Sequence, residues 1–219
     1  MSVMGFSQRT IEAVTHGRYL VDGREPGSPV LVGFHGYAES AEIQFERLQA
    51  VAGADPWILI SVQGLHRFYR GRSTDVVASW MTSQDREIAI ADNTMYATKV
   101  IDAVANEYSA NSKRVLAGFS QGVAMAFRSA IGLGRPVEGV IALGGDIPPE
   151  LDGSALSRIR TVLLARGTHD DWYTAEKMTA DERRLRAAGV NVQILSFDAP
   201  HEWTAEFNQA AARYLQSAR

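Results

Sequence analysis

Short apolar segments alternate with amphipathic helical patterns along most of this 219-residue chain. Runs rich in valine, isoleucine and leucine are typical of strands that are buried on both faces of a sheet. These runs are Val30–Phe34, Trp57–Val62, Val115–Phe119, Val140–Leu143, Thr161–Ala165 and Val192–Phe197. Because right-handed crossovers place the intervening helices on both faces of a sheet, the alternation predicts an α/β fold with a mostly parallel sheet.

The clearest helical pattern lies between Asp85 and Tyr108. One stripe of this segment consists of Ile90, Thr94, Ala97, Ile101, Val104 and Tyr108, at the spacing of a helix. Further helices are expected at Ala41–Ala52, Gln121–Ile131, Thr174–Ala188 and Glu202–Gln216. The alternating segment Arg9–Val21 predicts an antiparallel hairpin ahead of the first of these. Since no repeat or linker-like segment interrupts the pattern, we expect one domain over residues 1–219.

The composition excludes several classes of function. The chain contains no cysteine, which excludes disulfide frameworks, zinc fingers, iron–sulfur clusters and a thiol nucleophile. A formal net charge of −3 provides no long-range attraction for nucleic acid or an anionic membrane. The apolar runs are far shorter than the ~20 residues of a membrane helix, and Met1–Thr10 does not resemble a secretion signal. We therefore expect a cytoplasmic protein without a metal or other cofactor.

A Gly-x-Ser-x-Gly motif follows the predicted strand Val115–Phe119 and begins a predicted helix. It reads Gly118-Phe119-Ser120-Gln121-Gly122. A serine on a sharp turn between strand and helix needs small residues two positions before and after it, because larger side chains would collide with neighbouring elements. The helix N-terminus adds backbone amides where negative charge develops. The motif predicts a nucleophile at Ser120; the alternative is a serine N-cap between two packing glycines.

A nucleophilic serine needs a histidine to take its proton and a carboxylate to orient that histidine. His201 follows the predicted strand Val192–Phe197 and precedes the last helix, so it lies at the carboxyl end of a strand and late in the chain. This position favours His201 as the base, with a helix-cap role as the alternative. His16 and His66 fit surface or structural positions.

The carboxylate is expected after the strand Thr161–Ala165, where Asp170 and Asp171 are adjacent. Asp170 is favoured because it can point back across the strand ends, whereas Asp171 can cap the helix that begins near Thr174. His169 lies in the same segment and is the weaker candidate for the base, because a base directly beside its orienting carboxylate in sequence would point elsewhere.

An oxyanion hole needs two backbone amides, usually one after the nucleophile and one after an early strand. The early strand Val30–Phe34 continues into His35-Gly36-Tyr37. Gly36 permits a close approach of the backbone, so we expect the amide of Tyr37 to act together with that of Gln121. His35 fits a structural hydrogen-bonding role in this turn better than a catalytic one.

These motifs together resemble the phospholipase/carboxylesterase family of α/β-hydrolases, which includes bacterial carboxylesterases and acyl-protein thioesterases. The matching segments are Gly118 to Gly122, Phe34-His35-Gly36, Gly167-Thr168-His169-Asp170 and the late His201, and they cover nearly the whole chain in order. The resemblance implies an α/β-hydrolase fold. It also implies roles for Ser120 as nucleophile, Asp170 as acid, His201 as base, and Tyr37 and Gln121 as oxyanion donors.

Four positions depart from the common pattern of that family. Val123 replaces a second glycine after the serine motif, and Tyr37-Ala38 replaces Leu-Gly. Arg166 replaces a histidine that is common before the glycine of the acid segment. We expect these changes to affect the shape of the substrate site more than the catalytic groups.

The substrate pocket is expected to be open and partly aromatic. Gly144–Arg160 comprises only 17 residues, too few for a helical lid domain. The 23-residue segment Gln63–Asp85 has no predicted strand or helix, and long segments of this kind are usually functional. The expected pocket residues are Phe68, Trp80, Trp172 and Trp203, and the alternative for the aromatic residues is that they pin the loop to the body of the protein. The nearby Arg67, Arg70 and Arg72 are solvated charges or, alternatively, bind an anionic part of the substrate.

The predicted function is hydrolysis of carboxylic esters, with short to medium acyl or aromatic groups, through an acyl-enzyme on Ser120. A small-molecule ester is the expected partner, and a homodimer is left open. Alternative activities are those of a thioesterase, a lysophospholipase, a peptidase or a dienelactone-type hydrolase, although the last usually uses cysteine. A non-catalytic binding protein on the same scaffold is the alternative from another class. A nucleotide-binding protein is disfavoured because no glycine-rich phosphate loop follows a strand.

Overall fold

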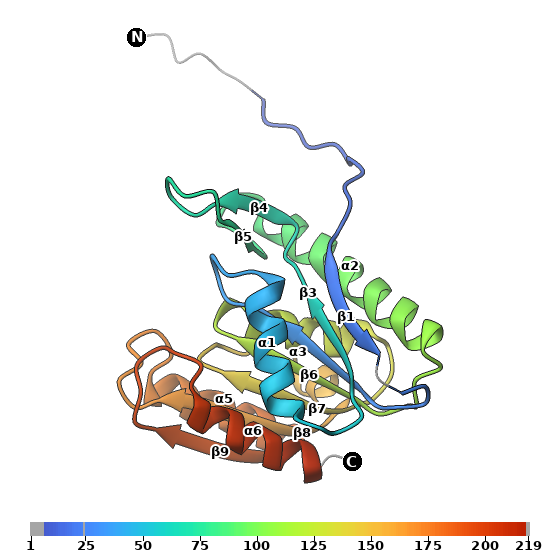
Figure 1. Ribbon diagram of the computed structural model, residues 1–219. Helices are drawn as coiled ribbons and strands as arrows, with labels where there is room; N and C mark the ends of the chain where they lie inside the picture. The colour runs from blue at the N-terminus through green and yellow to red at the C-terminus, as the bar shows by residue number, and fades with distance from the viewer. Residues whose placement is uncertain (1–6, 24, 218–219) are drawn as a thin grey trace.

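A seven-stranded sheet forms the centre of the computed structural model, which describes residues 7–23 and 25–217 (Figure 1). The strand order is β1-β3-β2-β6-β7-β8-β9. The strands are β1 (Tyr19–Gly23), β2 (Val30–Phe34), β3 (Ile58–Val62), β6 (Arg114–Phe119), β7 (Val137–Leu143), β8 (Ile159–Gly167) and β9 (Asn191–Phe197). Strand β1 is antiparallel to β3, and the other neighbouring pairs are parallel. The prediction of a mostly parallel sheet is confirmed.

Helices cover both faces of the sheet (Figure 1). On one face lie α1 (Ala41–Ala52) and α6 (Ala205–Ser217), and on the other lie α2 (Arg86–Glu107), α3 (Gln121–Gly132), α5 (Ala175–Ala187) and the short α4 (Gly153–Leu156). Successive strand residues enter opposite clusters: Val30 and Val32 pack towards α2 and α3, whereas Leu31 packs towards α1 and α6. This alternation explains why the inner strands are apolar at nearly every position. None of the helices in the described part of the chain is long and apolar enough to cross a membrane.

Strand β2 is the point at which the strand order reverses. The chain passes from β2 to β3 on one side and later returns as β6 on the other side of β2. In open α/β sheets such a switch point leaves a crevice at the carboxyl ends of the two neighbouring strands. The segments that follow β2 and β6 are those with the His-Gly and Gly-x-Ser-x-Gly motifs, so the topology brings them together.

Two edges of the fold differ from the sequence-based expectations. The hairpin predicted at Arg9–Val21 is wrong: only the end of this segment enters a strand, β1, and its partner is β3. Ile11 and Val14 have exposed fractions of 94% and 97%, so they supply no apolar packing for a second strand. Strand β9 was expected to be buried on both faces, but it is an edge strand with exposed residues along it.

The segment Gln63–Asp85 also has structure that the sequence did not reveal. It contains a separate antiparallel hairpin of β4 (His66–Tyr69) and β5 (Val76–Ser79). These strands have only four residues each, too few for an alternating pattern to stand out. Between β7 and β8 the chain forms only α4, of four residues, so no lid domain is inserted there.

Candidate active site

Ser120 lies on a sharp, strained turn between β6 and α3. Its backbone has φ 53° and ψ −120°, a conformation that residues other than glycine rarely adopt and that is typical of nucleophile turns. The Ser120 amide donates to the Leu143 carbonyl of β7, at 2.9 Å. A Cβ atom at Gly122 would lie 2.1 Å from the Phe34 carbonyl oxygen, so only glycine lets α3 approach β2 this closely. The turn therefore has the geometry that the motif predicts.

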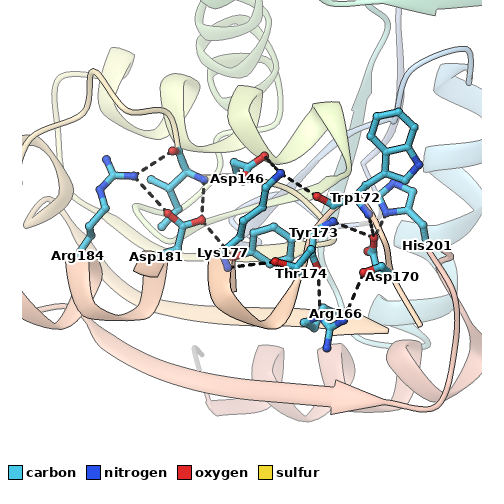
Figure 2. A network of polar contacts seen from close by, with 11 residues as sticks. Asp146, Arg166, Asp170, Trp172, Tyr173, Thr174, Lys177, Asp181, Arg184 and His201 are labelled. Carbon is cyan, nitrogen blue, oxygen red and sulfur yellow. Dashed lines mark hydrogen bonds and ion pairs between the residues drawn. The ribbon is translucent and has the colours of Figure 1, made fainter. Parts of the chain in front are cut away.

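His201 and Asp170 form a close pair at the carboxyl ends of β8 and β9 (Figure 2). The Nδ1 atom of His201 lies 2.7 Å from Oδ2 of Asp170. The other carboxylate oxygen, Oδ1, accepts hydrogen bonds from the amides of Trp172 and Tyr173, each at 2.9 Å. Asp170 is buried, whereas Asp171 is exposed. The carboxylate of Asp170 thus orients the imidazole with its Nε2 atom available for proton transfer.

Two consecutive glycines after β7 connect the serine turn with the histidine–aspartate pair. A Cβ atom at Gly144 would lie 3.1 Å from Cε1 of His201, and one at Gly145 would lie 2.3 Å from the Ser120 carbonyl oxygen. The Phe119 ring, beside Ser120 in sequence, lies 5.0 Å from the His201 ring between centroids. The structure therefore brings Ser120, Asp170 and His201 to one place.

The remaining histidines lie outside this arrangement. His169 has its Nε2 atom 2.9 Å from Oδ1 of Asp198, and its side chain is largely exposed. His16 and His66 are exposed as well. His35 is fully buried in the turn after β2, where its ring stacks on Trp80.

His35 supports this turn as a neutral imidazole. Its Nε2 atom accepts a hydrogen bond from the Gly64 amide at 3.0 Å, and its Nδ1 atom lies 2.7 Å from the Gly36 carbonyl oxygen, to which it donates. Burial lowers the pKa of His35 below its ordinary value of 6.5, against the opposing effect of the Gly36 carbonyl. Protonation of Nε2 would remove the acceptor for Gly64.

The lowered pKa of His35 predicts acid sensitivity of the fold. The unfolded chain takes up a proton near pH 6.5 and the folded chain does not. Stability is therefore full above this pH and falls as the pH drops towards the folded pKa, by up to about 1.4 kcal/mol per pH unit. Urea unfolding between about pH 7.5 and 5.5 should show a shallower pH dependence in His35→Gln than in the wild type. The exposed His66→Gln should retain the wild-type slope, and equal slopes in all three proteins would contradict the role of His35.

The two expected oxyanion donors follow neighbouring strands: Tyr37 lies after β2 and Gln121 lies after β6. In the turn after β2, the Gly36 amide donates to Oε2 of Glu39 at 2.7 Å and the Ala38 amide donates to the Ala78 carbonyl at 3.0 Å. The amide of Tyr37, between them, donates no hydrogen bond to another described residue. Gln121 is the first residue of α3, where backbone amides have no acceptor within the helix. Both amides can therefore donate to a bound group.

Two residues that no sequence motif indicates, Glu39 and Arg47, hold the turn of Tyr37. Arg47 of α1 donates to both carboxylate oxygens of Glu39, at 2.7 and 2.8 Å. The Arg47 guanidinium also lies over the Phe119 ring, 4.7 Å from its centroid. One ion pair thus supports both the turn that contains Tyr37 and the ring that packs on His201.

Arg166, which departs from the family pattern, holds the segment with Asp170 (Figure 2). The buried guanidinium donates to the backbone carbonyls of Tyr173, Thr168 and Asp170, at 2.9, 3.2 and 3.3 Å. This arginine therefore fixes the acid-bearing segment through its backbone, a role that sequence position alone did not reveal.

A cavity of about 540 Å³ opens beside Ser120. Its lining residues are Met81, Thr82, Ser83, Arg86, Ser120, Gln121, Ala124, Arg128, Gly144, Gly145, Asp146, Ile147, Pro148, Pro149, Trp172 and Lys177. The side chain of Gln121 fixes one wall, because it accepts from the Trp80 amide at 2.9 Å and donates to the Met81 carbonyl at 3.0 Å. No group of three or more histidine, aspartate or glutamate side chains that could hold a metal occurs in the described ranges.

Of the four aromatic residues expected in the pocket, Trp172 is at the cavity wall and the other three are elsewhere. Trp80 is fully buried and donates from its indole to the His35 carbonyl at 2.8 Å. Trp203 packs in the core against Phe119 and Phe207. Phe68 lies in the β4–β5 hairpin, against the ring of Tyr37. Arg67, Arg70 and Arg72 likewise do not line the cavity, and the arginines that do are Arg86 and Arg128.

Comparisons with known proteins agree with this architecture. A family model described as Phospholipase/Carboxylesterase matches residues 16–218. Among solved structures, esterase PE8 is similar with a TM-score of 0.72 at 20% identity, over 93% of this chain and 98% of that one. A carboxylesterase from Mesorhizobium loti matches with a TM-score of 0.74 at 16% identity, over 91% and 94%. Arabidopsis thaliana SOBER1 matches with a TM-score of 0.70 at 15% identity, over 87% and 99%. A search of curated protein sequences gives no significant match.

The structural matches concern the fold, since their identities are 20% or lower. Together with the family model, they confirm the α/β-hydrolase fold that the sequence predicts.

Proposed function

The chain belongs to the phospholipase/carboxylesterase family, and from this membership we propose that it is a serine hydrolase that cleaves carboxylic esters through an acyl-enzyme. Hydrolase activity of the esterase or thioesterase type is supported by the family and by its structural neighbours. The observation that carries the finer proposal is the Asp170–His201 pair beside the strained turn of Ser120.

In the proposed mechanism, the Oγ atom of Ser120 attacks the ester carbonyl carbon while Nε2 of His201 takes its proton. Asp170 keeps Nδ1 protonated and stabilises the imidazolium that forms. The amides of Tyr37 and Gln121 donate to the carbonyl oxygen as it becomes negative. His201 then returns the proton to the leaving alcohol, and an acyl group remains on Ser120. A water molecule repeats the sequence and releases the acid.

The cavity favours esters with short to medium acyl or aromatic groups. Its volume of about 540 Å³ is in the usual range for small-molecule sites. Met81, Ile147 and Trp172 give it apolar wall area next to Ser120. The same acyl-enzyme chemistry can cleave thioesters, so the nature of the leaving group is a separate question from that of the nucleophile.

A panel of 4-nitrophenyl esters, from acetate to palmitate, tests this proposal. We expect turnover with a maximum at short or medium acyl length, because longer chains exceed the cavity. Ethyl butyrate and S-ethyl thiobutyrate, which share the same acyl group, then compare an oxygen with a sulfur leaving group. Hydrolysis no faster than in buffer across all substrates would overturn the proposal and favour a non-catalytic binding protein on this scaffold.

A further inference from the structure

We propose that Arg86 and Arg128 form an anion-binding subsite in this cavity, and that the enzyme prefers esters carrying a carboxylate away from the scissile bond. Both arginines line the cavity that contains Ser120. The inference rests on the proposed ester hydrolysis and names its class of substrate.

The two guanidinium groups converge on one thioether. Nη1 of Arg86 lies 3.0 Å from Sδ of Met81, and Nη1 of Arg128 lies 3.8 Å from the same sulfur. A thioether is a weak acceptor, so the two Nη1 atoms have no strong acceptor from the described residues where they meet. A carboxylate there would replace the weak contacts with charge-assisted hydrogen bonds, for which the planar guanidinium is well suited.

The charges around the subsite favour a monoanion. Arg128 is buried, and burial lowers the pKa of its guanidinium. Its Nε and Nη2 atoms lie 2.8 and 2.7 Å from Oε1 of Glu150, which balances one positive charge. Lys177, also at the cavity wall, pairs with Asp146 at 3.5 Å. Arg86 makes no direct ion pair with a carboxylate in the described part of the chain and interacts with Glu150 only at longer range, so the two guanidinium groups share this one carboxylate and one positive charge is left unbalanced.

The helix α3 sets the direction and distance of this subsite from the nucleophile. Ser120, Ala124 and Arg128 follow one another at intervals of four residues and all line the cavity. Eight residues of helix advance about 12 Å, and helical side chains lean towards the N-terminus, which here is the serine end. The small side chain of Ala124 leaves room between the two. A substrate lying along this face would place its carboxylate several bonds from the carbonyl that Ser120 attacks.

Matched ester series test the subsite. The first series contains monomethyl esters of dicarboxylic acids from succinic to azelaic acid, and the second contains methyl esters of the unbranched monocarboxylic acids of equal length. The measured quantity is the ratio of kcat/KM for the charged ester to that for its neutral partner. We expect this ratio to peak at an intermediate length, at about tenfold or more in the wild type, and to fall as salt is added.

Variants of the exposed Arg86 identify the source of the preference. The ratio should fall towards one in Arg86→Gln, drop further in Arg86→Glu, and be largely retained in Arg86→Lys. Because both esters share the same scissile bond, a general loss of activity leaves the ratio unchanged. Arg160→Gln is the matched control, since Arg160 is exposed at the start of β8 and does not line the cavity.

The possible failures of the two proposals can be distinguished. A wild-type ratio near one at every length, or a ratio that is the same in Arg86→Gln as in the wild type, would overturn the subsite while leaving ester hydrolysis intact. No turnover of either series or of the 4-nitrophenyl esters would instead overturn the proposed function, whereas turnover of the 4-nitrophenyl esters with none of the charged series would overturn the subsite.

Discussion

Replacement of Ser120 with alanine is expected to lower kcat for ester hydrolysis by about 10⁴-fold or more, because no acyl-enzyme can form without its Oγ atom. The folded state should change little. The side chain of Ser120 accepts no helix-capping hydrogen bond, and alanine experiences the same backbone strain at φ 53° as serine does. The loss should therefore appear in kcat with an unchanged thermal unfolding midpoint.

A surface serine provides the control for this variant. Ser157 is exposed at the end of α4, where its hydroxyl donates to the Ser154 carbonyl, and it does not line the cavity. Ser157→Ala should keep wild-type turnover. Substantial turnover in Ser120→Ala, measured with the best 4-nitrophenyl ester, would contradict the assignment of the nucleophile.

Asp170→Asn is expected to lower kcat by up to about 10⁴-fold, with a smaller change in KM. An asparagine can still accept from the amides of Trp172 and Tyr173 through its carbonyl oxygen. Its NH₂ group would then face Nδ1 of His201 and stabilise the tautomer in which Nε2 carries the proton and cannot accept one from Ser120. The charge that stabilises the imidazolium would also be lost.

The neighbouring aspartate is a matched control. Asp171 is exposed and differs from Asp170 by one position in sequence, so Asp171→Asn should have little effect on kcat. A loss in Asp171→Asn equal to that in Asp170→Asn, or small losses in both, would show that Asp170 is not the orienting acid.

The inner fold was predictable because each inner strand is apolar on both faces. Val30 and Leu31 point to opposite helical layers and are both fully buried, so the run Val30–Phe34 is recognisable without knowledge of its neighbours. At the sheet edges this signal fails. Strand β9 is exposed at four of its seven residues, and β1 depends on pairing with β3, which local sequence does not specify.

The proposed catalytic residues were easier to predict from the sequence than the residues that support them. The serine motif, its strand and the order of Asp170 and His201 are local or sequential signals. In contrast, Arg166 acts through backbone carbonyls of a folded segment, and Arg47 acts through Glu39 and Phe119. These contacts exist only after folding, and no short pattern encodes them.

The pocket residues were hardest to predict because an aromatic side chain near a motif can equally enter the core. Trp80 and Trp203 lie in the core, where they pack on His35 and Phe119, whereas Trp172 has an exposed fraction of 77%. Whether such a side chain enters the core or the cavity depends on which strand ends surround it in the folded protein. Arg86 and Arg128 lie on helices that the sequence predicted, yet their convergence on Met81 depends on the packing of α2 against α3.

Covalent labelling with a fluorophosphonate, followed by mass spectrometry of the digested protein, is the most direct test of an activated serine at this turn. We predict a single adduct on Ser120, formed much more slowly in His201→Ala and absent in Ser120→Ala. A wild-type protein that forms no adduct, or forms one on another residue while Ser120 stays unmodified, would contradict the account.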